Sequence, residues 1–329
     1  IGLLYPLYSW STRVSENMWR LGDIEHKINW NMPTIKLMIE ALQIKPSIVD
    51  KPNARVIDHT VPHRIEFRNL SHTYPTGQRD IDELPASLKK VSFTIEKGEK
   101  VAIIGSSGAG KTTVMKKTLR FDDPTSGAIL VDGTDLRDIT QRSWRRGLGY
   151  IPQQPQIFDG TIRMNLTYGL SARERELVTD AELWELMRLL QIDFKERLAE
   201  KGLDTIVGKN GLKLSGGQAQ RLMIGAAVIK KPWLLIIDEG TASLDSSTEK
   251  EVQKGLATVL ANGTSALIVA HRLNTVRTLC TKFIVLKSAG EVVNGDSQVE
   301  AVGNSFEELY RDSPTFRRLA DDQGLTIKV

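Results

Sequence analysis

The sequence predicts an α/β fold with a mostly parallel central sheet. Apolar stretches of strand length alternate with helical stretches: "KVAIIG" precedes a helix that starts at Lys111, and "WLLIIDEG", "SALIVAH" and "KFIVLK" are separated by one helix each. "KVAIIG" is almost entirely apolar, which favours a central position in the sheet. A further helical interval from Gly160 to Lys230 indicates a helical subdomain inserted between strands.

The chain that precedes the sheet is expected to form a helix and a linker. "WNMPTIKLMIEAL" is helical, with Pro33 near its start. "IKPSIVDKPNARVID" (Ile44 to Asp58) contains two prolines and mixed charge, as is typical of a linker. We therefore expect one part over residues 1–60 and a second over residues 61–329, with the helical subdomain at about 160–230.

The remaining elements follow from local patterns. "RIEFRNLSHTY" alternates apolar and polar residues, which predicts a half-buried strand that ends at Tyr74. "VSFTI", "GAILVDG" and "LGYIP" are three more short strands. Within the inserted block, "DAELWELMRLLQI" predicts an amphipathic helix with Leu183, Leu186, Met187 and Leu190 on its apolar face.

Composition excludes several classes of protein. The 329 residues carry a net charge of +4, which is too weak to indicate nucleic-acid binding, so no nucleic-acid partner is expected. The single cysteine, Cys280, cannot form an internal disulfide, which fits a reducing compartment. No stretch reaches the 18 apolar residues of a spanning helix. The apolar stretch Ile1 to Trp10 is read as a buried or surface helix in preference to the end of a spanning one.

"GSSGAGKT" matches the pattern G-x-x-x-x-G-K-[ST] and lies between an apolar strand and a helix, the context of a phosphate-binding loop. Glycines let successive N–H groups curl around phosphate oxygens, and the helix start adds its dipole. The lysine would supply a charge to the terminal phosphates and the first threonine a ligand for Mg²⁺. The predicted nucleotide-binding residues here are Gly105, Ser106, Ser107, Gly108, Ala109, Gly110, Lys111, Thr112 and Thr113.

Polar side chains follow three other apolar strands. The strand "LLIIDEG" places Asp238 and Glu239 at the sheet edge where ligands bind. Asp238 is suited to bind Mg²⁺, and Glu239 can point at a water. His271 ends the next strand, and Gln153 follows "GYIP". Each also has a purely structural interpretation, as a capping pair, a packed histidine or a solvated loop residue; the phosphate loop favours the functional one.

"KLSGGQAQR" is a second glycine-rich helix start. Ser215 and two glycines precede a helix that the sequence predicts from Gln220 to Lys230. A hydroxyl and bare backbone at a helix start suit an anion. One chain would then hold two anion sites for one evident ligand.

The order of these motifs resembles the nucleotide-binding domain of ABC transporters. Tyr74, "GSSGAGKT", "IPQ", "LSGGQ", "IIDE", "SLD" and "VAHR" carry the resemblance, which covers roughly Arg64 to Lys287. It implies a P-loop NTPase (RecA-like) core with an antiparallel β part, ATP and Mg²⁺ as cofactors, and ATPase activity coupled to transport. "LSGGQ" between a phosphate loop and an Asp-Glu pair is a specific combination.

The resemblance also implies why there are two anion sites. In this family two copies bind ATP head to tail, and "LSGGQ" of one copy caps the γ-phosphate held by the other. Ser215, Gly217 and Gln218 would serve the partner's ATP, and Asp245 would work across the dimer interface.

Further roles carried over from the family concern the reaction itself. Tyr74 would stack on adenine, and Glu239 would polarise the attacking water. Gln153 would sense Mg²⁺ and that water, and His271 would contact the γ-phosphate. Thr112, Gln153 and Asp238 are the metal-site residues.

"FDGTIRMNL", "AHRLNTV" and "MIEALQIKPSIVD" are similar to exporters, in which membrane and ATPase parts share one chain. The implied partners are a second nucleotide-binding domain and the transmembrane domains, at the cytoplasmic face of the plasma (inner) membrane. The sequence departs from the family at Lys209, where exporters carry glutamate, and at Ala219, where arginine is usual.

Two other function classes stay open at this point. A soluble ABC-type ATPase of DNA repair or translation would carry two cassettes or a long coiled coil, and neither pattern is in this sequence. A regulator that binds nucleotide without turnover would have no use for Glu239.

Overall fold

The computed structural model describes residues 4–74, 86–192, 201–209, 211, 213–238, 246–261, 263–269, 272–293 and 295–327. The chain divides into two compact units, Ile1–Val49 and Asp50–Val329.

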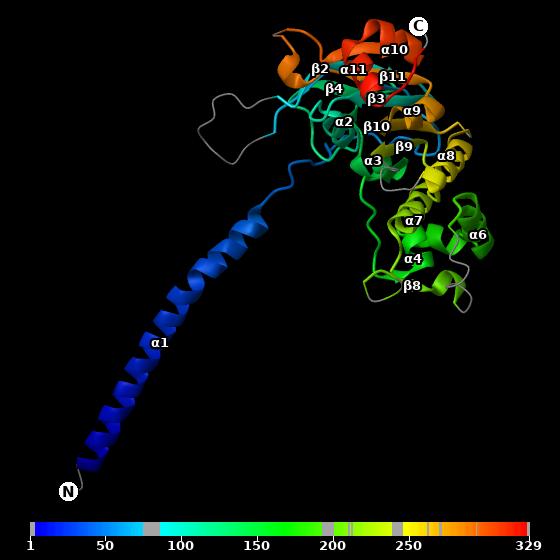
Figure 1. The fold of residues 1–329 in the computed structure, drawn as a ribbon. Helices are drawn as coiled ribbons and strands as arrows, with labels where there is room; N and C mark the ends of the chain where they lie inside the picture. Colours follow the sequence, from blue (N-terminus) through cyan, green and yellow to red (C-terminus); the bar gives the residue numbers. More distant parts are fainter. Residues whose placement is uncertain are drawn as a thin grey trace. The chain divides into compact units, whose positions relative to one another are not determined.

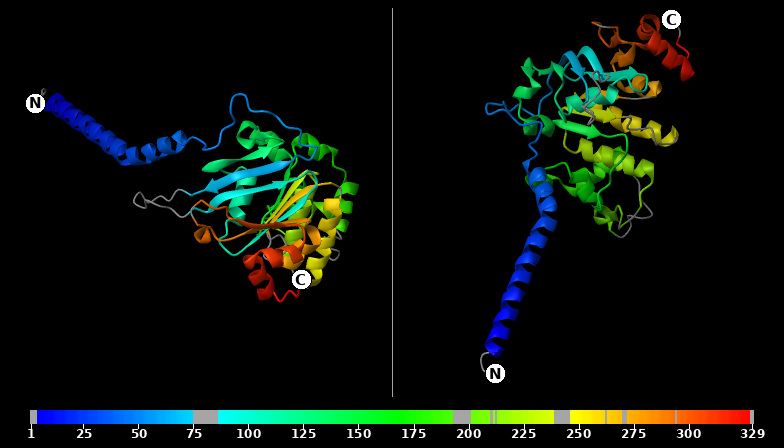
Figure 2. Two further views of the ribbon diagram at one scale, coloured as in Figure 1. Left: turned by 90° about the horizontal axis from the view of Figure 1, so that it is seen from above. Right: turned by 90° about the vertical axis from the view of Figure 1, so that its left-hand side faces the viewer.

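The first unit is one helix, α1 (Leu4–Gln43), which bends along its length (Figure 2). Pro33 lies inside it, not near the start of a shorter helix as the sequence indicated. A proline removes one backbone hydrogen bond and commonly bends a helix, while the flanking turns keep their own bonds. No residue of α1 is buried, so the structure does not give this helix the buried position considered for its apolar end. In the described part of the chain, no helix combines the length and the hydropathy needed to cross a membrane.

The second unit is built on a six-stranded sheet with the order β12-β11-β3-β10-β9-β6 (Figure 1). Its pairs are parallel except for β11 with β12, so the mostly parallel sheet is confirmed. β3 is central, as its apolar sequence predicted. The strands are β3 (Lys100–Gly105), β6 (Leu148–Ile151), β9 (Leu234–Asp238), β10 (Ser265–Val269), β11 (Lys282–Leu286) and β12 (Val299–Gly303).

A second, antiparallel sheet has the order β2-β1-β4-β5. Its strands are β1 (Ile65–His72), β2 (Leu88–Ile95), β4 (Ser126–Val131) and β5 (Thr134–Asp135). One face of the central sheet and this second sheet share an apolar core that contains Phe67, Ile103 and Trp144. β1 ends two residues before Tyr74, which therefore lies beyond the strand.

The helices of the second unit lie on both faces of the central sheet or form the inserted block. The two that begin at Lys111 and Gln141 belong to the core shared with the second sheet, and most of the others pack in the core on the opposite face. The helices are α2 (Lys111–Thr118), α3 (Gln141–Arg146), α4 (Ile162–Thr167), α5 (Ala172–Leu177), α6 (Asp180–Leu189), α7 (Gly216–Val228), α8 (Ser246–Ala261), α9 (Leu273–Leu279), α10 (Phe306–Asp312) and α11 (Pro314–Asp322), with short 3₁₀ turns η1 (Leu136–Asp138), η2 (Gly202–Asp204) and η3 (Ala289–Glu291). Leu183, Leu186, Met187 and Leu190 are buried together, as predicted.

The inserted block is not purely helical. β7 (Gly160–Thr161) and β8 (Ile206–Val207) pair antiparallel at its edge. Strands of two residues are too short to give a periodic signal, which is why the sequence did not reveal them. Figure 1 shows α4, α6, α7 and β8 grouped together, away from α2.

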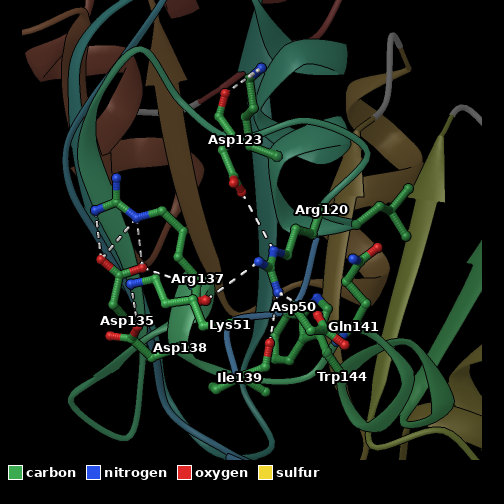
Figure 3. A network of polar contacts seen from close by, with 12 residues as sticks. Asp50, Lys51, Arg120, Asp123, Asp135, Arg137, Asp138, Ile139, Gln141 and Trp144 are labelled. Atoms are coloured by element: carbon green, nitrogen blue, oxygen red, sulfur yellow. Dashed lines mark hydrogen bonds and ion pairs between the residues drawn. The ribbon is translucent and has the colours of Figure 1, made fainter. Parts of the chain in front are cut away.

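The part of the expected linker that belongs to the second unit, from Asp50 onward, is held against the rest of that unit (Figure 3). The N–H of Arg55 donates to the carbonyl of Asp138 at 2.7 Å, and the N–H of Thr140 donates to the carbonyl of Arg55 at 2.8 Å. Asp50 accepts from the N–H of Gln141 at 2.9 Å and pairs with the buried guanidinium of Arg120 at 3.6 Å. Arg120 lies two residues after the end of α2, so its ion pair with Asp50 holds the linker beside the end of the helix that follows the phosphate loop.

Candidate nucleotide-binding site

The phosphate loop follows β3 directly, and three glycines shape it for different reasons. A Cβ on Gly105 would lie 2.6 Å from the carbonyl oxygen of Leu286. Gly108 has a φ of +79° with open space around it. Gly110 has a φ of +78°, and a Cβ there would lie 2.5 Å from the carbonyl oxygen of Ser87. The sequence predicted that glycines allow a tight turn here, and the contacts explain each one.

Lys111 begins α2 inside the curve of this loop. Its ammonium donates to the carbonyl of Gly105 at 2.8 Å and to that of Ser106 at 2.9 Å. The side chain is buried, whereas Ser107 and Thr112 are exposed. The loop therefore holds a cation close to exposed hydroxyl and backbone groups, which is the arrangement that a polyphosphate requires.

Gln298 is a supporting residue that the sequence did not reveal. Its fully buried side-chain amide donates to the carbonyl of Ala109 in the phosphate loop and to that of Lys287, each at 3.0 Å. Its oxygen accepts from the N–H of Lys89 at 2.9 Å. One amide thus ties the loop to β2 and to the end of β11. Gln298 lies 189 positions after Ala109 in a segment without a motif, so no local signal was available.

The carboxyl ends of neighbouring strands bring further polar residues to the same sheet edge. Asp238 is the last residue of β9, is 8% exposed and is in register with Val269 of β10. Gln153 is exposed and follows the end of β6, which pairs with β9. Burial, and then the nearby Asp238 carboxylate, raise the pKa of Tyr150. A buried carboxylate at this edge can serve a cation.

Three predicted residues lie outside the described part of the chain. They are Glu239, Asp245 and His271. The strands that lead to Glu239 and His271, β9 and β10, are adjacent and parallel.

Tyr74 lies beside α2. Its hydroxyl is 3.5 Å from the hydroxyl of Thr113, and 38% of the residue is exposed. An aromatic ring at this place has a free surface for a base next to the phosphate loop.

Ser215 is the N-cap of α7, which starts at Gly216, four residues earlier than the sequence indicated. Its hydroxyl accepts from the N–H of Gln218 at 3.3 Å, while the Gln218 side chain accepts from the N–H of Ser215 at 3.0 Å. This capping box gives Gln218 a local structural role. Ser215 and Gly216 are exposed, and a Cβ on Gly216 would meet nothing within 4 Å. α7 packs on α4, α6, α8 and β6, so this helix start belongs to the inserted block.

The expected metal donors are one hydroxyl, one amide and one carboxylate, on Thr112, Gln153 and Asp238. Such oxygen ligands suit Mg²⁺ bound jointly with phosphates. In the part of the chain that the structure describes, no three His, Cys, Asp or Glu side chains are grouped so that they could hold a metal ion. The donor set therefore fits a cation shared with a substrate better than a site made of protein ligands alone.

Comparison with known proteins gives one consistent result. Residues 88–242 match the family described as "ABC transporter". The chain is 36% identical over 267 residues to "ABC transporter B family member 6" of Dictyostelium discoideum, covering 78% of this chain and 38% of that protein. It is 37% identical over 275 residues to the "ATP-dependent lipid A-core flippase" of Syntrophus aciditrophicus, covering 83% and 43%.

A solved structure matches as well. "Structure of a bacterial Atm1-family ABC exporter with ATP bound" superposes with a TM-score of 0.76 at 31% identity, covering 93% of this chain and 50% of that one. The chain thus spans half or less of the length of each of these three proteins.

Proposed function

Because this chain belongs to the ABC transporter family and carries an ATP-binding domain of the exporter type, we propose that it binds Mg²⁺–ATP and hydrolyses it to power export across a membrane. The observation that carries the proposal is the common sheet edge: the phosphate loop follows β3, and Asp238 ends β9, with β10 between these two strands. Phosphoryl transfer needs positioned cations and a carboxylate at one place, and this edge supplies both.

In this proposal each residue acts on one part of the substrate. The loop N–H groups and Lys111 hold the β- and γ-phosphates, and Tyr74 stacks on the adenine. Glu239 accepts a proton from the attacking water as the water oxygen bonds to the γ-phosphorus; the bond from that phosphorus to the β–γ bridging oxygen breaks, and ADP and inorganic phosphate are the products. His271 would steady the same phosphate. Mg²⁺, held by Thr112, Gln153 and Asp238, would neutralise charge on the phosphates.

We also propose a head-to-tail dimer with two composite sites. Ser215 and the N–H of Gly217 lie at the start of α7, in the inserted block, while Lys111 starts α2 on the central sheet. If a second copy places the start of its α7 against this phosphate loop, the two anion-binding elements, one from each copy, bind the same ATP. Asp245 would then act at the interface between the two copies.

Transmembrane domains are the second proposed partner. A groove of about 500 Å³ lies between the segment after Gln153 and α7. Phe158 and Tyr168 stack in its wall with ring centroids 4.1 Å apart and are exposed by 39% and 54%. Exposed aromatics beside a residue of the nucleotide site suit a helix end that must sense that site. We propose that a transmembrane domain docks here, at the cytoplasmic face of the plasma (inner) membrane. Separately, we propose that residues 1–60 are the cytoplasmic end of a transmembrane domain and its linker.

The substitution Glu239→Gln tests the proposed hydrolysis. The amide cannot accept a proton, so turnover is expected to fall about 10²–10⁴-fold while ATP still binds. Steady-state phosphate release and equilibrium ATP binding measure the two quantities separately. Wild-type turnover in this variant would contradict the assigned role. A chain that binds no ATP in either form would contradict the proposed function itself.

A further inference from the structure

A cluster of polar side chains lies behind the Tyr74 ring, on the side of α2 and β1. The His72 ring meets the Tyr74 ring edge to face, with centroids 4.5 Å apart. The ammonium of Lys117 lies 5.4 Å from the centroid of the same ring. Lys117 also pairs with Asp122 at 2.7 Å, and Asp122 in turn lies 3.5 Å from Nε2 of His72. Tyr74 thus contacts an ion pair and a histidine that are themselves connected.

The burial of this cluster is unusual for its chemistry. The side chain of Lys117 is fully buried, and that of His72 is 7% exposed. Burial lowers the pKa of Lys117, which the Asp122 carboxylate opposes. Burial, and then the Lys117 charge, lower the pKa of His72. Because a lysine is seldom buried without a reason, the pairing with Asp122 and the contact with Tyr74 need an explanation.

The cluster also ties Tyr74 to its neighbours in the chain. Nδ1 of His72 lies 3.3 Å from the hydroxyl of Thr125, and that hydroxyl accepts from the N–H of Thr73 at 3.2 Å. The two residues before Tyr74, His72 and Thr73, are therefore both held by the Thr125 hydroxyl. The backbone leaves β1 at His72, so these contacts set the direction in which the ring leaves the strand.

We propose that His72, Lys117 and Asp122 are positioning residues for nucleotide binding, which hold the Tyr74 ring at the angle needed to stack on the base. This inference rests on the proposed ATP binding. The Lys117 ammonium supports the ring by a cation–π contact, and Asp122 fixes that ammonium. The 38% of Tyr74 that is exposed remains available to the base. A ring held in place loses less freedom when it stacks, so affinity rises without any new contact to the nucleotide.

The first experiment examines the ring without nucleotide. NMR of the chain with labelled tyrosine rings compares Tyr74 in the wild type, Lys117→Met and Lys254→Met. Lys116 cannot serve as the control, since its ammonium also lies over the ring, at 5.9 Å from the centroid. Lys254 is an exposed lysine of α8 and makes none of the contacts described for Tyr74. Lys117→Met is expected to shift and broaden the Tyr74 signals, and Lys254→Met to leave them nearly unchanged. Unchanged Tyr74 signals in Lys117→Met would overturn the proposal whether or not the chain binds ATP.

The second experiment is a double-mutant cycle on the dissociation constants of ATP and inorganic tripolyphosphate. Tyr74→Ala should weaken ATP binding by about 5- to 150-fold. Lys117→Met should weaken it about fivefold alone, but less than about twofold when Tyr74 is already alanine. Tripolyphosphate, which has no base, should bind both variants as it binds the wild type. An equal loss in both backgrounds, or an equal loss for tripolyphosphate, would show that Lys117 acts on the phosphate loop instead.

Asp122→Asn provides an independent test that keeps the buried lysine and its packing. The Asp122 side chain is 34% exposed, so this substitution is the milder one for folding. It should weaken ATP binding in the same direction as Lys117→Met, again only when Tyr74 is present. An Asp122→Asn chain with wild-type ATP affinity and wild-type Tyr74 signals would refute the role of the ion pair.

Discussion

Alanine substitutions at the three loop glycines should separate two physical effects, steric clash and backbone strain. Gly108→Ala adds only strain, because its φ is +79° and the space around it is open. Placing an L-residue in this region costs about 1–2 kcal/mol. Gly105→Ala adds only a clash, because its Cβ would lie 2.6 Å from the carbonyl oxygen of Leu286. Such overpacking costs about 1–3 kcal/mol.

Gly110→Ala combines both effects. Its φ is +78°, and the new Cβ would lie 2.5 Å from the carbonyl oxygen of Ser87 and 2.6 Å from Cδ2 of Leu88. Adding the two costs gives a loss of about 2–5 kcal/mol, a large part of the roughly 5–15 kcal/mol by which domains are stable. We expect the order of destabilisation to be Gly110→Ala first, then Gly105→Ala, then Gly108→Ala.

Urea denaturation of each variant, read as the free energy of unfolding, measures this order. Gly133→Ala is the matched control: its φ is +82°, nothing lies within 4 Å of its Cβ position, and it lies outside the phosphate loop. It should cost the same stability as Gly108→Ala but leave ATP binding unchanged, whereas Gly108→Ala should weaken it. Equal destabilisation by Gly108→Ala and Gly110→Ala would show that the steric clash at Gly110 adds nothing to the backbone strain.

Three further substitutions test the supports of the site. Gln298→Leu removes three buried hydrogen bonds and should cost about 3 kcal/mol or more in urea denaturation, while the same change at the exposed Gln154 should be nearly neutral. Arg120→Met leaves Asp50 without its guanidinium partner and should make the linker more sensitive to proteolysis than wild type. Hydrogen bonds from the side chain and N–H of Ser171, and the nearby Arg146, lower the pKa of Glu174 to about 2, so its stabilising effect is complete above its usual pKa and is lost as the pH falls towards 2. Glu174→Gln should therefore flatten the loss of stability between about pH 4.5 and pH 2, and an unchanged profile would contradict this.

The central sheet and the phosphate loop could be predicted because each strand, and the loop itself, is a short contiguous segment with a recognisable pattern. β3, β9, β10 and β11 are short apolar runs, and the loop glycines and Lys111 lie within eight positions of one another. Asp238 was placed correctly at the end of β9 because a parallel strand delivers its last residue to a known edge.

Other features depended on contacts between distant segments, and the sequence could not predict them. Gln298 reaches Ala109 across 189 positions, and Lys117 of α2 and His72 of β1 contact the same Tyr74 ring. A buried lysine in α2 reads in the sequence as a surface residue, since only its pairing with Asp122 makes burial tolerable. The preference of proline for the first turn of a helix predicts a helix start near Pro33, but the helical turns on both sides of Pro33 form one continuous helix.

The most direct test of the account mixes two inactive chains, Ser215→Arg and Lys111→Ala, and follows the ATPase rate against the mixing ratio. In a mixed dimer one site keeps an intact phosphate loop and an intact α7 start, and the other site receives both changes. Each chain alone should be inactive, and an equal mixture should recover about a quarter of the wild-type rate, because half of the dimers are mixed and each has one working site of two. A Ser215→Arg chain that hydrolyses ATP at the wild-type rate without any partner would contradict the composite site.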